Sequence, residues 1–254
     1  MIPLRTEWQA QTDTGLVREH NEDRYCAAES LGVWAVADGM GGLARGDWAA
    51  TAVVDAISGL QRIEDFGAML AAVSDAIRGA NDKVLAESQA VGAQMGTTVV
   101  VLVVRDRRFG IIWVGDSRAY MLRDGQLHQL SRDHSQVQEL IDRNLLTRDG
   151  AATHPLRHVL TRAVGVGDPI DIDMITDTML PGDVFLLCSD GLHGVVDDLE
   201  ITNQLESIES TDAVSAMVAR CIDRGAPDNV TVVTIVATEP TLLHFGSVTA
   251  GSPQ

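Results

Sequence analysis

The stretch "GTTVVVLVV", residues Gly96 to Val104, is followed after a short break by "FGIIWVGDS", residues Phe109 to Ser117. Both runs are far shorter than a membrane-spanning helix. They are also too uniformly apolar for strands that have one face in water. We therefore predict that they are central strands of a sheet that is covered on both sides.

Helices and further strands are predicted on either side of these two runs. Residues 45–60 and 66–87 carry apolar side chains at helical spacing. The pair Asp124-Gly125 lies between "AYMLR" and "QLHQL", which predicts a two-residue hairpin and antiparallel pairing. The other predicted elements are strands in "LGVWAVADG" (31–39), "PIDIDMI" (169–175), "DVFLLCSDG" (183–191) and "DNVTVVTIVA" (228–237), and helices near Val137 and over 211–224.

Composition and length restrict the class of protein. The 254 residues show no internal repeat or long linker, so one compact domain with a polar surface insertion after Ser131 is expected. The net charge of −17 opposes binding to nucleic acid and to anionic membranes. No signal peptide or membrane-inserting segment is recognised, and three cysteines without close pairing favour a reducing, cytoplasmic location.

Four aspartates stand at the ends of predicted strands. Asp38 ends "AVAD", Asp116 ends "IIWVGD", Asp190 ends "FLLCSD", and Asp228 precedes "NVTVVTIV". If these strands share sheets, the carboxylates gather at one end of the core, where they repel one another and raise one another's pKa values. Divalent cations would remove that penalty, and all-oxygen ligands suit Mg²⁺ or Mn²⁺. The alternative is that the Asp-Gly and Asp-Ser pairs only form turns.

Seven segments resemble, in order, the motifs of bacterial-type PP2C (PPM family) metal-dependent serine/threonine protein phosphatases. They are "RTEWQAQTDTGLVREHNEDRY", "VADGMGG", "GTTVVV", "VGDSRAYMLRDG", "HPLRHVLTRAVG", "LLCSDGL" and "DNVTVV". The resemblance implies an α+β fold, a four-layer α-β-β-α sandwich of two antiparallel sheets flanked by helices. It further implies a single phosphatase domain over residues 5–237, with a flap insertion at about 135–160, and leaves 238–254 as a loosely ordered tail.

The resemblance also implies a centre of two Mn²⁺ or Mg²⁺ ions. Asp38 would bridge the two ions, and the carbonyl of Gly39 would bind one of them. Asp190 and Asp228 would supply further oxygens, and Asp116 would hold a third ion together with Asp190. Water activated by the two ions would hydrolyse phosphoserine and phosphothreonine.

Three residues near the N-terminus match other parts of the family's site. Arg18 matches the phosphate-binding arginine, whose planar fork suits a phosphoryl group; the alternative is a surface ion pair with Glu19 or Glu22. Glu22 and Asp23 match an acidic pair that acts around the metal-bound waters.

Some positions depart from the family pattern or have simpler interpretations. Met40 stands where animal members have a histidine proposed as general acid, so the general acid is unassigned. His193, in "SDGLHGVV", is expected to be non-catalytic. Gly41 and Gly42 are expected to let the backbone of their loop approach the ions closely. We expect caps or surface contacts at His134, His154 and His158. Cys188 is expected to be a small buried apolar residue.

The implied function is dephosphorylation of proteins, in opposition to a bacterial serine/threonine kinase of eukaryotic type. That kinase and its substrates, such as phosphorylated forkhead-associated proteins, are the implied partners, with type VI secretion regulators as a further suggestion. One alternative is a non-catalytic binding module of the same fold, against which Arg18, Asp38, Asp190 and Asp228 argue. Another is a regulator of an anti-sigma factor network, which usually carries a sensory module.

Overall fold

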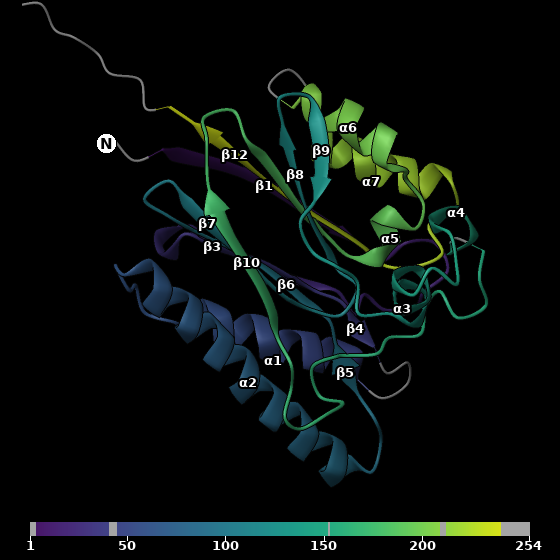
Figure 1. Cartoon of the computed structure of the whole chain (residues 1–254). Coiled ribbons are helices and arrows are strands. Elements are labelled where there is room, and N and C mark those ends of the chain that lie inside the picture. The colour runs from purple at the N-terminus through teal and green to yellow at the C-terminus, as the bar shows by residue number, and fades with distance from the viewer. Residues whose placement is uncertain (1–3, 41–44, 152, 209–211, 240–254) are drawn as a thin grey trace, which may run out of the picture.

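Two β-sheets pack face to face, and helices cover the outer face of each sheet (Figure 1). This computed structural model describes residues 4–40, 45–151, 153–208 and 212–239. The arrangement is the α+β, four-layer α-β-β-α sandwich of two antiparallel sheets that the resemblance implied. Gly41, Gly42 and all but Thr238 and Glu239 of the expected tail lie outside the described residues.

The first sheet joins the two ends of the described chain. Its strands, in spatial order, are β1 (Arg5–Asp13), β12 (Val230–Thr238), β11 (Val184–Cys188), β8 (Arg118–Arg123) and β9 (Gln126–Gln129). All neighbouring strands are antiparallel. The predicted hairpin at Asp124-Gly125 connects β8 and β9, and both of its residues have positive φ, as a two-residue turn of this kind requires.

The second sheet takes its central strands from the two apolar runs at residues 96–104 and 109–117. In spatial order its strands are β10 (Asp173–Thr178), β7 (Arg108–Val114), β6 (Val99–Arg105), β3 (Val33–Ala37) and β2 (Arg24–Ala28). A separate two-stranded ladder pairs β4 (Gly39–Met40) with β5 (Gly96–Thr97). Because β6 and β7 are almost entirely buried in the middle of the sheet, the prediction of central, doubly covered strands is confirmed.

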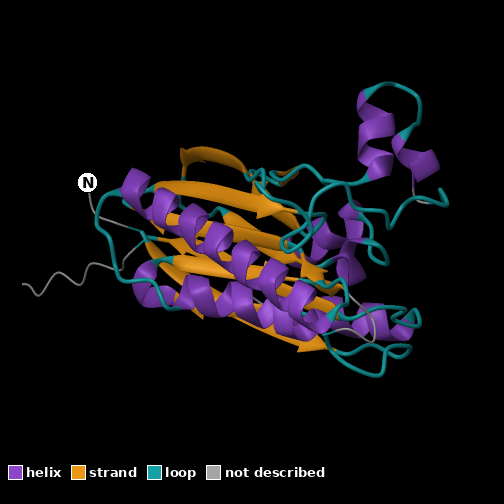
Figure 2. Ribbon diagram, turned by 90° about the horizontal axis from the view of Figure 1, so that it is seen from below, coloured by secondary structure: helices purple, strands orange, loops and turns teal. Residues whose placement is uncertain are grey.

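Helices form the outer layers. The long helices α1 (Gly46–Ser58) and α2 (Phe66–Val91) lie side by side across the second sheet (Figure 2). Asp65 caps the N-terminus of α2 by accepting a hydrogen bond from the Ala68 N–H, and Gly92 ends the helix at φ +67°. The remaining helices are α6 (Asp198–Glu206) and α7 (Ala213–Asp223) over the first sheet, the short α3 (Gln136–Asp142), α4 (Arg148–Ala151) and α5 (Asp190–His193) at one end, and a 3₁₀ turn η1 (Glu29–Leu31).

Three apolar layers hold the sandwich together. Trp34, Phe109 and Phe185 meet in the central layer between the sheets, while separate clusters seal each sheet against its helices. These packed layers hold the strand ends rigidly, and the polar loops converge at one of those ends. No helix in the described part of the chain is both long enough and apolar enough to cross a membrane.

Candidate functional site

The four aspartates predicted at strand ends lie at one end of the sandwich. Asp38 follows β3 and Asp116 follows β7, and these strands are both antiparallel to β6 and so point the same way. Asp190 follows β11, while Asp228 precedes β12, which runs antiparallel to β11. Topology therefore brings together carboxylates that are distant in the sequence.

Asp38 lies at the electrostatic centre of this group. Burial, followed by the charges of Asp23, Asp190, Asp116 and Asp228, raises the pKa of its carboxyl well above the usual range. The contribution of these four charges, which comes second to burial, is the mutual repulsion that the sequence pattern predicts for gathered acids.

The backbone of Asp38 is fixed by the "GTT" segment. The Asp38 N–H donates to Thr98 Oγ1 at 3.0 Å, and the Asp38 carbonyl accepts from the Thr98 N–H at 2.8 Å and from the Thr97 hydroxyl at 2.9 Å. At Gly39 an added Cβ would lie 2.3 Å from the Gly46 carbonyl oxygen. Only glycine therefore fits at this point, where the chain passes between α1 and the residues around Glu22.

Glu22 and Asp23 brace the surrounding elements. Glu22 Oε1 accepts from the Gly46 N–H at 3.1 Å, at the start of α1. Asp23 Oδ2 accepts from the hydroxyls of Ser189 and Thr231, both at 2.7 Å, and so ties β2 to the ends of β11 and β12. Burial raises the pKa of Asp23 to about 7. Its Oδ1 atom is buried without a hydrogen-bond partner among the described residues.

Arg18 pairs with Asp228 rather than with Glu19 or Glu22. Its Nε donates to Asp228 Oδ1 at 2.9 Å and its Nη2 to Oδ2 at 2.7 Å. The Arg18 side chain remains 54% exposed, so the guanidinium faces solvent at the mouth of the site. Arg18, the predicted phosphate-binding residue, and Asp228, a predicted metal-binding residue, thus neutralise each other in this arrangement.

Asn229 is a site residue that the sequence reasoning missed. Its side-chain amide donates to the carbonyls of Thr14 and His20, and its Oδ1 accepts from the Glu22 N–H at 2.8 Å. It therefore fixes the loop that carries Arg18. The available signal was its place directly after Asp228 in "DNVTVV".

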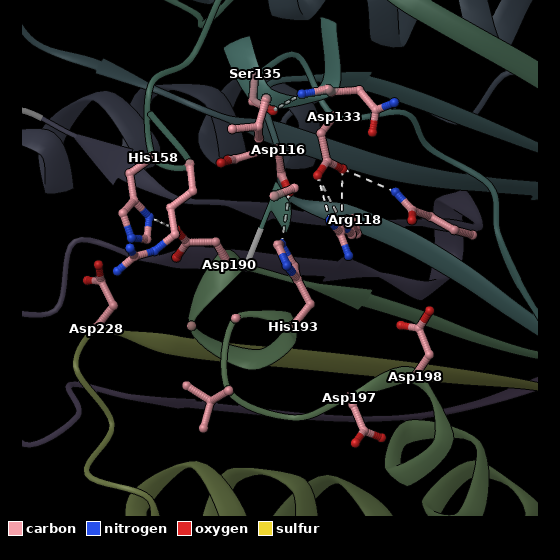
Figure 3. A pocket seen from close by; sticks show the side chains of 18 of the residues that line it. Asp116, Arg118, Asp133, Ser135, His158, Asp190, His193, Asp197, Asp198 and Asp228 are labelled. Carbon is pink, nitrogen blue, oxygen red and sulfur yellow. Dashed lines mark hydrogen bonds and ion pairs between the residues drawn. The ribbon is translucent and has the colours of Figure 1, made fainter. Parts of the chain in front are cut away.

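The histidines around the site have different surroundings. His158 Nδ1 lies 3.6 Å from Asp190 Oδ2. Figure 3 marks this contact with a dashed line. His134 is buried, and its Nδ1 accepts from the Gly115 N–H at 3.1 Å. His193 lies 3.1 Å from the Asp116 carbonyl oxygen, and burial, followed by the charge of Arg118, lowers its pKa to about 4. His154 receives a hydrogen bond from the Leu156 N–H, so it acts as a local cap.

A cavity of about 860 Å³ opens beside these residues. Asp190 and Asp228 line one part of it, and Asp197 and Asp198 line another (Figure 3). Arg18 also lines the cavity. Apolar side chains contribute to the wall: Val137 and Ile141 of α3, Val195, and Leu199 of α6. The cavity is thus large enough to receive a peptide segment as well as a phosphoryl group.

The carboxylates of this aspartate cluster fit hard divalent cations, although some of them are turned toward other partners in this structure. The carboxylates are all-oxygen donors, they carry uncompensated repulsion at Asp38, and Asp23 Oδ1 is a buried oxygen without a partner. Asp228 is turned toward Arg18, and Asp190 lies near His158. Within the described ranges, no three His, Cys, Asp or Glu side chains converge closely enough to enclose an ion. To enclose an ion, carboxylates such as that of Asp228 would have to rotate away from their present partners.

Comparison with known proteins gives consistent matches. Residues 17–233 match the family described as Protein phosphatase 2C. The chain is 37% identical over 234 residues to the serine/threonine protein phosphatase PstP of Mycobacterium tuberculosis, which covers 91% of this chain and 45% of PstP. It is 32% identical over 237 residues to the serine/threonine phosphatase stp of Listeria monocytogenes, covering 89% and 93% of the two chains. The chain thus spans about half the length of PstP.

Solved structures match as well. The structure of PppA, described as a key regulatory component of T6SS in Pseudomonas aeruginosa, superposes with a TM-score of 0.84 at 38% identity, over 91% of this chain and 97% of the other. The catalytic domain of PstP in complex with two manganese ions superposes with a TM-score of 0.85 at 34% identity, over 93% and 100% of the chains.

Proposed function

The chain belongs to the protein phosphatase 2C family, and from this premise we propose that it hydrolyses phosphoserine and phosphothreonine in proteins. The observation that carries the proposal is the cluster of repelling carboxylates around Asp38, at a cavity whose rim carries the guanidinium of Arg18. A binding module without chemistry would have no use for this uncompensated charge.

The cluster is proposed to hold two Mn²⁺ or Mg²⁺ ions. Asp38, the Gly39 carbonyl, Asp190 and Asp228 would be their ligands, and Asp116 with Asp190 would hold a third ion. When bound, the ions supply a Lewis acid and an acidified water for attack on phosphorus. The manganese complex of the related PstP domain supports this assignment.

Each protein group then has a part in binding and orientation. Arg18 is proposed to hold the phosphoryl oxygens with its planar fork, for which it must leave Asp228. Thr97 and Thr98 hold the Asp38 backbone through three hydrogen bonds. Asp23 orients the Ser189 hydroxyl directly before Asp190. Met40 has no titratable proton, so the leaving-group proton is not assigned to a side chain at that position.

The wider context is part of the same proposal. Phosphorylated proteins, a cognate serine/threonine kinase and its substrates are the proposed partners, and the similarity to PppA supports type VI secretion regulators as candidates. The three cysteines carry no disulfide, which favours a cytoplasmic location. We retain residues 5–237 as one phosphatase domain, with the segment 135–160 as its flap.

The proposal is tested by hydrolysis of a phosphothreonine peptide with protein stripped of metal by a chelator and then supplied with Mn²⁺, Mg²⁺ or Ca²⁺. Turnover restored by Mn²⁺ or Mg²⁺ supports it. A folded sample that binds the peptide but remains inactive with all three ions would favour the non-catalytic module instead. Arg62→Ala provides a control variant, since its ion pair with Glu64 is exposed and lies on a different segment from the site.

A further inference from the structure

His193 contacts the backbone of Asp116, and the proposed function gives this contact no role. Its Nε2 atom lies 3.1 Å from the carbonyl oxygen of Asp116 (Figure 3). A carbonyl oxygen can only accept, so Nε2 must carry the hydrogen and donate it. The contact is therefore a specific hydrogen bond that requires one tautomer of the ring.

This hydrogen bond connects the two carboxylates proposed for the third ion. Asp190 and His193 are the first and last residues of α5, a single turn in which the Gly194 N–H donates to the Asp190 carbonyl at 2.8 Å. Positions three apart on a helical turn lie on the same face. Asp116, by contrast, belongs to the turn between β7 and β8. The His193 ring thus spans from the element that carries Asp190 to the element that carries Asp116.

The other residues of the Asp116 turn have partners elsewhere. Gly115 exchanges two hydrogen bonds with His134, at 3.1 and 2.9 Å. The Ser117 hydroxyl lies 2.6 Å from the Thr98 hydroxyl. Both anchors belong to the side of the turn that faces β6 and the base of the flap. The bond from His193 ties the Asp116 carbonyl, in the residue that carries the buried carboxylate, to α5, a link that neither of these two anchors supplies.

We propose that His193 is a positioning residue that holds Asp116 at a set distance from Asp190, and that it thereby determines the affinity of the third, two-aspartate ion site. The inference rests on the proposed function, because that function assigns Asp116 and Asp190 to an ion. It assigns His193 no contact with substrate or with an ion. Residues that orient metal ligands typically change metal affinity by about 10- to 100-fold when they are removed.

Isothermal titration of the intact, chelator-treated protein with Mn²⁺ tests the proposal without reference to hydrolysis. His193→Leu fills similar space but has no donor, whereas His193→Gln places an amide N–H₂ where Nε2 lies. We expect His193→Leu to weaken the lowest-affinity Mn²⁺ site by about 10- to 100-fold while the tighter sites change less than about threefold. His193→Gln should restore most of that affinity. A purely structural role of the ring would not predict rescue by a linear amide.

A double-mutant comparison separates an effect that acts through Asp116 from a general loss of folded structure, because a folding defect of His193→Leu would persist in any background. In the Asp116→Asn background, His193→Gln and His193→Leu should have the same Mn²⁺ affinities as each other, because the residue acts through Asp116. Unchanged Mn²⁺ binding in His193→Leu, or additive losses with Asp116→Asn, would overturn the proposal. A wild-type protein that hydrolyses no phosphopeptide yet shows this pattern would refute the proposed function alone, and a wild-type protein that binds no Mn²⁺ would refute both.

Discussion

The guanidinium of Arg18 and the carboxylate of Asp228 form a two-point ion pair, with Nε 2.9 Å from Oδ1 and Nη2 2.7 Å from Oδ2. Each group is proposed to bind a different part of the reacting complex, phosphate in one case and cation in the other. The ion pair must break before either group can bind its ligand. Phosphate that binds Arg18 therefore frees Asp228 for a cation, and a cation that binds Asp228 frees Arg18 for phosphate. Phosphate and Mn²⁺ should therefore bind cooperatively, each tightening the other by the same factor.

Removal of the guanidinium should separate substrate binding from metal binding. Arg18→Ala is expected to raise KM for a phosphothreonine peptide by about 10- to 100-fold, the range for loss of hydrogen bonds to a charged group. Mn²⁺ affinity should not fall, because Asp228 is released from its partner. Steady-state kinetics and calorimetry measure the two effects. Arg18→Lys keeps the charge but loses the planar fork, so its KM should lie between those of the wild type and Arg18→Ala. A wild-type KM in Arg18→Ala would contradict the assignment.

Neutralising Asp38 should stabilise the metal-free protein and abolish its response to metal. The raised pKa of this carboxyl means that the folded state disfavours its ionised form, so Asp38→Asn replaces it with a group that has no such form. Tm without metal should rise, by about 2–4 °C for each kcal/mol gained in a protein of this size. Mn²⁺ affinity should fall more than about 100-fold, beyond the usual effect of a residue that only orients ligands. Thermal unfolding with and without Mn²⁺ checks both, and near-normal turnover would refute the bridging role.

The buried carboxylates should make the metal-free protein less stable as pH rises from about 4 to about 7. His193 contributes in the opposite direction over much of this interval, because burial lowers its pKa to about 4. Burial raises the pKa of Asp23 to about 7, and burial and neighbouring carboxylates raise those of Asp38 and Asp116. The folded state therefore holds protons that the unfolded chain has already released. The free energy of unfolding then falls by up to about 1.4 kcal/mol per pH unit for each titrating group.

Urea unfolding at pH 5, 6 and 7 in the presence of a chelator measures this slope. Mn²⁺ should flatten it, because bound cations stabilise the ionised form of the buried carboxylates. Asp38→Asn should reduce it in the absence of metal. An Asp38→Asn variant whose stability changes with pH as the wild type's does, both without metal, would contradict the contribution assigned to Asp38.

Loss of the Ser189 hydroxyl should weaken both the fold and the site. Ser189→Ala leaves the buried Asp23 carboxylate with one donor fewer, which should reduce the free energy of unfolding by about 1–3 kcal/mol. Turnover should fall as well, because Ser189 directly precedes Asp190. Ser58→Ala is a matched control: its hydroxyl donates to the Asp55 carbonyl on the exposed end of α1, and its loss should have little effect on either quantity. Equal effects from the two substitutions would argue against the bracing role of Asp23.

Local patterns in the sequence were sufficient for the buried elements. The continuous apolar runs of β6 and β7 and the helical spacing over α1 and α2 were predicted, with α2 extending to Val91 rather than to residue 87. The edge strands β1 and β2 were not predicted as strands. β1 reads "RTEWQAQTD" and is half exposed along its length, so its pairing with β12 leaves no apolar signature. The strand expected over 31–39 also divides at Asp38 into β3 and β4.

The sequence by itself determined which chemistry was present: acids at four strand ends, an arginine near the N-terminus and the order of the family's motifs. Only the tertiary structure decided their partners. Arg18 meets Asp228 across 210 positions, and His193 meets Asp116 across 77. The physical reason is that apolar periodicity depends on neighbours along the chain, whereas these contacts depend on how two sheets pack and on which strand ends that packing brings together.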